Sequence, residues 1–131
     1  MSQLPESHLD LLDEPVVVML ATVMPDGQPQ VTPIWCDREG DMVRVNPAVG
    51  RQKDRNLRER PLVTVAATDP QNAYRWLEIR GEVVETIEGQ PAHDHIDKLS
   101  QDYFGRPFTY NSPDEKRVLF KIKPTKVNAS G

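Results

Sequence analysis

Short β-branched segments separated by turn residues are the feature that most restricts how this chain can fold. Residues 16–23 form an apolar run broken only by one threonine, which predicts a strand buried on both faces. Pro25, Asp26 and Gly27 follow, and they favour a tight turn because proline presets φ and Asp-Gly accepts positive φ. Residues 30–37 then return as the second arm of a hairpin. The first third of the chain therefore predicts antiparallel pairing.

Later segments repeat this alternation of strand and turn. We expect further strands at residues 42–46, 62–68, 74–87 and 118–123, and short helices at residues 4–12, 51–58 and 91–104. Val127 can continue the last strand beyond Pro124, and Gly105 is expected to cap the last helix. Pro33 predicts either a sheet edge or a bulge, because proline cannot donate to a ladder, and Gly81 predicts a bulge.

The predicted elements add up to about six strands with three short helices inserted between them. Consecutive hairpins imply antiparallel pairing, and closure of the sheet removes its unpaired edges. A chain of 131 residues is expected to form one domain, here spanning residues 1–131. The predicted fold class is therefore mainly β, a six-stranded antiparallel barrel with short helices.

Composition excludes several classes of protein. The single cysteine, Cys36, excludes an internal disulfide and a cysteine-based zinc site, and it is expected to be a buried small hydrophobe. No signal peptide pattern opens the chain, and the apolar run of residues 16–23 is too short to span a bilayer. A sequence pI of about 5.3 argues against a nucleic-acid binder. We expect a cytoplasmic protein with no membrane or nucleic-acid partner.

A cationic segment stands out in this acidic chain, whose net charge is −4. Residues 51–60 contain five cations and two carboxylates, a local charge of +3: Arg51, Lys53, Arg55, Arg58 and Arg60 against Asp54 and Glu59. One interpretation is that the segment neutralises itself through helical i, i+4 pairs, Asp54 with Arg58 and Arg55 with Glu59. Arg51 and Lys53 have no such partner. They lie at the predicted helix start, where free amides and the helix dipole favour an anion such as phosphate.

Other candidate residues have competing interpretations. Trp35 either lies in the core or forms the wall of a site for a flat ligand beside Pro33. His93 and His95 fall on different faces of a helix, which predicts an exposed polar face and no metal site. The last strand carries three lysines that are expected to face solvent, with contact to an acidic ligand tail as the alternative; they are Lys121, Lys123 and Lys126.

The order and spacing of five motifs resemble the pyridoxamine 5′-phosphate oxidase-like superfamily. The motifs occupy residues 18–22, 26–30, 31–35, 51–57 and 76–81, and the similarity extends over roughly residues 10 to 125. Among the branches of the superfamily, the chain is most similar to the compact actinobacterial-type reductases that depend on deazaflavin (coenzyme F420). True pyridoxamine phosphate oxidases are longer and carry substrate-phosphate motifs that are not found here, so that particular oxidation is not expected.

The resemblance implies a split β-barrel that forms a homodimer with two cofactor sites at the subunit interface. In similar proteins the cofactor phosphate lies on the segment matching Arg51 and Lys53, the ring lies against the strand matching residues 32–35, and the residue matching Trp76 approaches from the second subunit. The full set of cofactor-binding residues expected on this basis is Thr32, Pro33, Ile34, Trp35, Val45, Asn46, Arg51, Gln52, Lys53, Asn56 and Trp76.

The function implied by the resemblance is hydride transfer from reduced F420 to a small unsaturated organic substrate. In such reactions the cofactor carries the difficult chemistry and the protein binds and orients it. No catalytic residue and no metal ligand is therefore assigned. The first alternative is the same fold with FMN. The second is a non-enzymatic carrier or sensor of flavin or haem, and haem is disfavoured because the three histidines lie outside the predicted strands.

Overall fold

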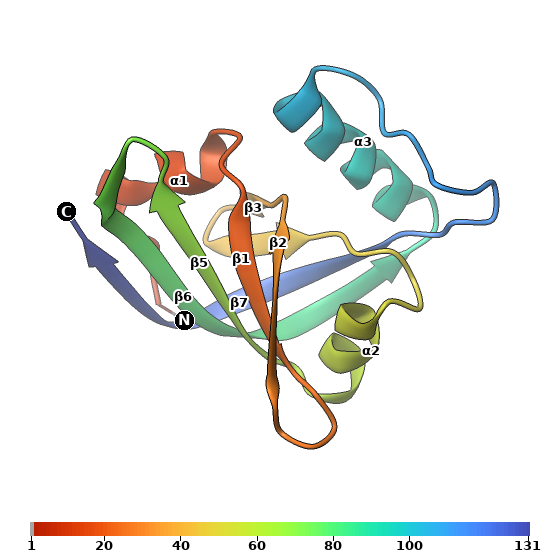
Figure 1. The fold of residues 1–131 in the computed structure, drawn as a ribbon, viewed down its shortest axis with the longest axis horizontal. Helices are drawn as coiled ribbons and strands as arrows, with labels where there is room; N and C mark the ends of the chain where they lie inside the picture. Colours follow the sequence, from red (N-terminus) through yellow and green to blue (C-terminus); the bar gives the residue numbers. More distant parts are fainter. Residues whose placement is uncertain (1) are drawn as a thin grey trace.

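Antiparallel strands form one strongly curved sheet in the computed structural model, which describes residues 2–131 (Figure 1). The strand order is β2-β1-β5-β6-β7-β4-β3. The strands are β1 (Val18–Val23), β2 (Pro29–Ile34), β3 (Asp37–Glu39), β4 (Met42–Val45), β5 (Leu62–Asp69), β6 (Asn72–Glu88) and β7 (Val118–Ser130). The helices are η1 (Glu6–His8), α1 (Asp10–Asp13), α2 (Gln52–Glu59) and α3 (Gln90–Phe104). The mainly β, antiparallel prediction is confirmed.

The sheet curls into a barrel because its two edge strands are consecutive in the sequence. β2 lies at one end of the strand order and β3 at the other, yet only Trp35 and Cys36 separate them. Two residues span a few ångströms, so the two edges must approach each other. The single strand predicted for residues 30–37 is thus two strands, and β3 adds a seventh to the expected six within the described chain. Cys36 is buried at this crossing, and burial raises the pKa of its thiol to about 12.

Barrel closure also corrects the expectation for residues 16–23. Side chains alternate along β1 and the residue before it: Val18 and Leu20 are buried, whereas Val17 and Met19 are 55% and 42% exposed. A barrel has one interior, so every second side chain of a strand points outward. Pro33 pairs with Met19 in an unbroken register, so it marks the sheet edge rather than a bulge.

The longest pairing, β6 with β7, bends where the sequence predicts it. The register shifts between Arg80 and Gly81, and β7 continues through Pro124 to Ser130. A Cβ atom at residue 81 would lie 2.5 Å from the Lys123 carbonyl oxygen, so glycine is required where the two backbones approach. The bulge at Gly81 and the extension of the last strand to Val127 are both confirmed.

The helices lie against the barrel at three places. The predicted helix at residues 4–12 is divided between η1 and α1, and Leu11 and Leu12 of α1 are buried in the core. In Figure 1, α2 and α3 lie on the same side of the barrel. Gly105 ends α3 in the left-handed conformation with φ of 71°, as predicted. Across residues 2–131, no helix combines the length and the apolar character that a membrane span requires.

Candidate functional site

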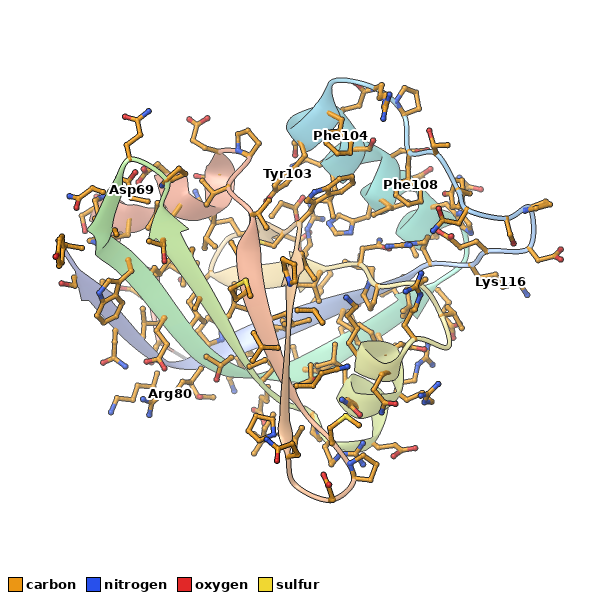
Figure 2. All side chains as sticks on the ribbon, viewed as in Figure 1. Asp69, Arg80, Tyr103, Phe104, Phe108 and Lys116 are labelled. Carbon is orange, nitrogen blue, oxygen red and sulfur yellow. The ribbon has the colours of Figure 1, made fainter. Side chains whose placement is uncertain are left out.

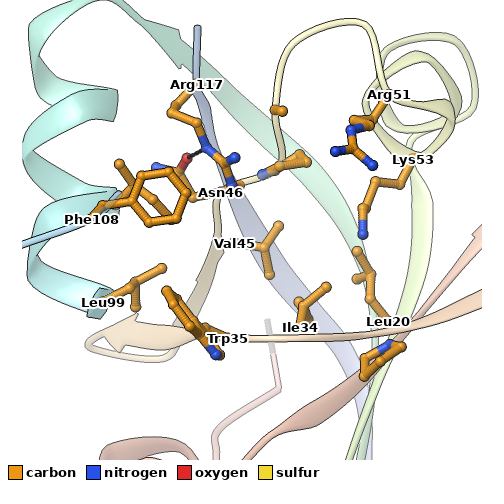
Figure 3. Close-up of a pocket in the computed structure, with 14 residues that line it drawn as sticks. Leu20, Ile34, Trp35, Val45, Asn46, Arg51, Lys53, Leu99, Phe108 and Arg117 are labelled. Carbon is orange, nitrogen blue, oxygen red and sulfur yellow. Dashed lines mark hydrogen bonds between the residues drawn. The ribbon is translucent and has the colours of Figure 1, made fainter. Parts of the chain in front are cut away.

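A cavity of about 290 Å³ opens between α2, α3 and the barrel wall (Figure 3). Its walls are contributed by segments far apart in the sequence: Leu20, Pro33, Ile34, Trp35, Val45, Asn46, Pro47, Ala48, Arg51, Lys53, Ile96, Leu99, Phe108 and Arg117. The two ends differ in character. Arg51 and Lys53 lie on the side of α2, whereas Trp35, Leu99 and Phe108 lie on the side of α3, with Arg117 beside Phe108 (Figure 3).

The cationic end carries charge without carboxylate partners. Arg51 is the N-cap residue of α2 and is exposed, and the Lys53 ammonium donates to the Thr32 hydroxyl at 3.1 Å. Within residues 2–131, neither Arg51 nor Lys53 forms an ion pair. Burial lowers the pKa of Lys53, and the nearby charges of Arg51 and Arg117 lower it further. An anionic group placed here would relieve that repulsion.

The rest of α2 explains why these two cations stay available. Asp54 is buried and accepts from Arg58 at 2.7 Å, so the predicted pair is confirmed. The predicted pair of Arg55 with Glu59 is wrong, because Glu59 pairs with Arg60 at 2.9 Å. Arg55 instead folds back toward the helix start and donates to the Gly50 carbonyl at 2.6 Å. The C-terminal part of the cationic segment thus neutralises itself, and its first residues do not.

An aromatic cluster forms the opposite end. Trp35 is half-buried, and its ring stacks on Tyr103 with centroids 5.3 Å apart. Phe104 and Phe108 meet the Trp35 ring edge-on at 4.9 and 6.3 Å. Figure 2 shows Tyr103, Phe104 and Phe108 together on and just after α3. Trp35 therefore lines the cavity and is not part of the barrel core. Such a wall suits a flat, largely apolar ring.

A chain of buried polar groups runs behind the cavity. His95 is buried, and its Nε2 lies 2.9 Å from the Asp37 carboxylate. The amide nitrogen of Asn46 lies 3.0 Å from His95 Nδ1 and 2.9 Å from the Ala92 carbonyl oxygen. Arg117 Nε donates to the Asn46 side-chain oxygen at 3.2 Å.

The structure corrects the expectation for the two histidines of α3. They were expected on an exposed polar face, yet His95 is buried because α3 packs that face on β6 and β7. His93 lies at hydrogen-bonding distance, 2.7 Å, from the Tyr110 hydroxyl.

Seven of the residues expected from the sequence line this cavity. They are Pro33, Ile34, Trp35, Val45, Asn46, Arg51 and Lys53. Thr32 contacts it indirectly through its hydrogen bond with Lys53. Gln52 and Asn56 bond to each other at 2.8 Å, and Asn56 is fully buried and donates to Thr22, which ties α2 to β1. Trp76 lies on the outward face of β6, away from the cavity of its own chain.

The three lysines of β7 do not line the cavity. Lys121 pairs with Glu39 at 3.0 Å and with Glu85 at 3.5 Å. Lys123 lies at 4.0 Å from a glutamate of β6. The charges of Lys121 and Lys123 are therefore balanced by neighbouring strands, and contact of the three lysines with a ligand tail at this site finds no support in their placement.

Seven residues that line the cavity were not foreseen: Leu20, Pro47, Ala48, Ile96, Leu99, Phe108 and Arg117. Two of them, Arg117 and Phe108, bring a cation and an aromatic ring to its wall. Both belong to the loop after α3 and its junction with β7, where Ala48 forms an isolated bridge with Arg117. The only local signal is a cation directly before an apolar strand, and many surface residues share that pattern. Arg117 and Phe108 come close to the cavity because β4 pairs with β7, which places Val45 opposite Phe120.

Comparisons with known proteins agree with this architecture. The sequence profile of a family described as pyridoxamine 5′-phosphate oxidase matches residues 4–131. An F420 reductase of known structure is 36% identical, with a TM-score of 0.84 over 95% of this chain and 98% of that one. A conserved hypothetical protein from Mycobacterium tuberculosis is 23% identical, with a TM-score of 0.77 over 99% and 89%. HupZ of Group A Streptococcus is 17% identical, with a TM-score of 0.69 over 97% and 94%.

The last two likenesses concern the fold alone, and together these matches confirm the split-barrel prediction. No curated protein sequence matches the chain significantly.

Proposed function

This chain belongs to the pyridoxamine 5′-phosphate oxidase family, and from that premise we propose that it is an oxidoreductase that transfers a hydride from reduced F420 to a small unsaturated organic molecule. The relationship to an F420 reductase supports a flavin-type or deazaflavin-type oxidoreductase. One observation carries the proposal: a single cavity joins two unpaired cations, Arg51 and Lys53, to an aromatic wall at Trp35.

The donor set fits a phosphate-bearing ring cofactor. The guanidinium of Arg51 and the ammonium of Lys53 offer charge-assisted hydrogen bonds to phosphate oxygens. Ile34 and Val45 offer apolar surface for a ring, with Trp35 beside them (Figure 3). Reduced F420 supplies the hydride when bound, and the chain has to hold the ring, aim it and exclude water.

The alternative functions are an FMN-dependent oxidoreductase and a non-enzymatic carrier of flavin or haem, and each predicts a different ligand or no turnover. The preference for F420 over FMN rests on the 36% identity to an F420 reductase, because both cofactors present a phosphate to Arg51 and Lys53. A carrier would bind cofactor without turnover. Haem has the weakest support, since among the described residues that line the cavity there is no histidine or cysteine to serve as an axial ligand.

A binding panel of F420, FMN, FAD and haem tests the proposal. The tryptophan emission of the protein, which comes from Trp35 at the cavity wall and from Trp76, should change on binding and report the dissociation constant of each ligand. We expect F420 to bind most tightly, and we expect reduced F420 to be consumed with at least one activated acceptor. Tighter binding of FMN would move the assignment to FMN, and binding of F420 without turnover on a broad acceptor set would favour a carrier.

We further propose that two copies of the chain form a homodimer and that each completes the other's site. A volume of about 290 Å³ lies just below the range for small-molecule sites, about 300–1,000 Å³, which fits a chain that encloses only part of a cofactor. The outward face of β1, β2 and β6 exposes Met19, Val31 and Trp76, and Val17 is exposed directly before β1. A second copy on this face would cover that apolar surface and bring its own Trp76 toward the ligand.

Light scattering tests the dimer. The wild-type protein is expected at twice the 14.9 kDa chain mass, and Val31→Lys is expected to shift it toward monomer and to weaken cofactor binding. Val84→Lys is the matched control, because Val84 is also an exposed valine but lies toward the far end of β6. A monomeric wild-type protein that still binds F420 tightly would contradict the shared site.

A further inference from the structure

We propose that Arg117 is an anion-binding residue of the cavity that selects ligands carrying a phosphate or carboxylate group, and that Asn46, held by His95, is the positioning residue that aims it. This inference rests on the proposed function, because it concerns the same cavity. It goes beyond that function by assigning a third cation from the opposite wall and a buried device that holds it.

Arg117 enters the cavity from the start of β7, opposite the two cations of α2 (Figure 3). Its side chain is 13% exposed, and its guanidinium lies 4.9 Å from the centroid of the Phe108 ring. Nε donates to the Asn46 side-chain oxygen, one terminal nitrogen to the Asn46 carbonyl, and the other to Glu115 at 2.9 Å. A guanidinium has five N–H groups, so two remain for a ligand.

The net positive charge around the cavity favours binding of an anion. Glu115 offsets one of the three cations, which leaves a net charge of +2 on Arg51, Lys53, Arg117 and Glu115. Burial lowers the pKa of Arg117, and Arg51 lowers it further, although the pairing with Glu115 opposes this. The cations are therefore close enough to repel one another, and an anionic oxygen among them would replace repulsion with charge-assisted hydrogen bonds.

The buried histidine explains why Arg117 is held in this orientation. His95 faces a carboxylate at Nε2, so its Nε2 carries the proton and donates to Asp37. The Asn46 amide nitrogen donates to the Ala92 carbonyl at 2.9 Å and lies 3.0 Å from Nδ1, so Nδ1 accepts its second N–H. The amide oxygen of Asn46 must consequently face the other way, toward Arg117 Nε. His95 does not line the cavity, so any effect of replacing it on ligand affinity is transmitted through Asn46.

Dissociation constants of Arg117→Gln for FMN, F420 and the neutral riboflavin test the first half of the proposal. We expect binding of FMN and F420 to weaken by about tenfold or more, binding of riboflavin to change little, and Arg117→Lys to restore part of the loss. The affinity of Arg117→Gln for FMN should also depend less on ionic strength. Unchanged FMN affinity, or an equal loss for riboflavin, would overturn the assignment of an anion contact.

Inorganic pyrophosphate separates this inference from the proposed function. If the wild-type protein binds no flavin, the proposed function fails. The role of Arg117 can still be decided by titrating pyrophosphate and following tryptophan emission. A smaller change in emission for Arg117→Gln than for the wild-type protein supports the anion contact, and an equal change overturns it. The Arg117→Gln change leaves the Glu115 carboxylate without its partner. If Arg117→Gln melts at a lower temperature than the wild-type protein, the double variant Glu115→Gln/Arg117→Gln is used in its place.

A double-mutant cycle tests the positioning role. His95→Gln can keep a donor toward Asp37 but lacks the Nδ1 acceptor, which together with the Ala92 carbonyl orients the Asn46 amide. We expect His95→Gln to weaken FMN binding in the wild-type background and to have little effect in the Arg117→Gln background, because the two changes act through one contact. Additive losses would overturn the positioning role. Asn46→Ala takes the place of His95→Gln in the cycle if that variant does not fold.

Discussion

An Arg51→Ala variant is expected to bind the phosphate-bearing cofactor about 1.5–3 kcal/mol more weakly than the wild-type protein, because a charge-assisted hydrogen bond is lost. Arg51 stands at the start of α2 and forms no ion pair within residues 2–131. Its removal should therefore leave the free energy of unfolding almost unchanged while lowering affinity. Titration of F420 and FMN, followed by tryptophan emission, measures the loss.

Arg55→Ala provides the matched control for this variant. Arg55 lies on the same helix and carries the same charge, but it donates to the Gly50 carbonyl and to Gln52 and does not line the cavity. We expect it to affect affinity much less than Arg51→Ala. If the two variants lose affinity equally, the effect is a general one of charge, and Arg51 is not a phosphate ligand.

An Asp37→Ala variant is expected to lower the free energy of unfolding by about 3–5 kcal/mol, the usual cost of leaving buried charged partners uncompensated. Asp37 accepts from both ends of the Arg44 guanidinium at 2.8 and 2.6 Å, from His95 at 2.9 Å and from Lys98 at 3.0 Å. Urea denaturation measures the loss. The control is Asp13→Ala, whose partly exposed pair with Arg38 should contribute less than about 1 kcal/mol.

The stabilisation by Asp37 should depend on pH with a definite sign. Burial alone would raise the pKa of Asp37, but hydrogen bonds from His95 and Arg44 outweigh it and hold that pKa well below its usual range. A carboxylate whose pKa is lower in the folded state than in the unfolded state stabilises the fold at pH values above its unfolded pKa, about 3.9 for Asp. That contribution is lost as the pH falls below this value toward the folded-state pKa. The stability gap between wild type and Asp37→Ala should therefore narrow below about pH 4. A gap that widens in acid would contradict this account.

Much of the framework follows from local sequence. The β-branched runs and their turns predicted six of the strands and their antiparallel pairing, and Gly81 and Gly105 were correctly assigned to a bulge and a helix cap. The pattern of i, i+4 charges correctly indicated that Arg51 and Lys53 would lack partners. These features depend on neighbours within a few residues, so the sequence carries them directly.

The contacts that join His95, Asn46 and Arg117 could not be predicted in this way. Asn46 and His95 are 49 residues apart, and Asn46 and Arg117 are 71 residues apart. No local pattern distinguishes a helix histidine that will be buried from one that faces solvent. His95 was therefore expected at the surface, and Arg117 and Phe108 were not recognised at all.

Residue type and spacing along the chain determined which segments are strands, where they turn and where positive charge goes unpaired, because propensity, turn geometry and helical pairing act over short distances. Closure of the barrel decided the rest. It brought β2 and β3 together as the two edges of one sheet, turned Val17 and Met19 outward, and placed Arg117 opposite Arg51. These outcomes depend on which distant surfaces pack together, a balance of burial and charge that exists only once the whole chain has folded.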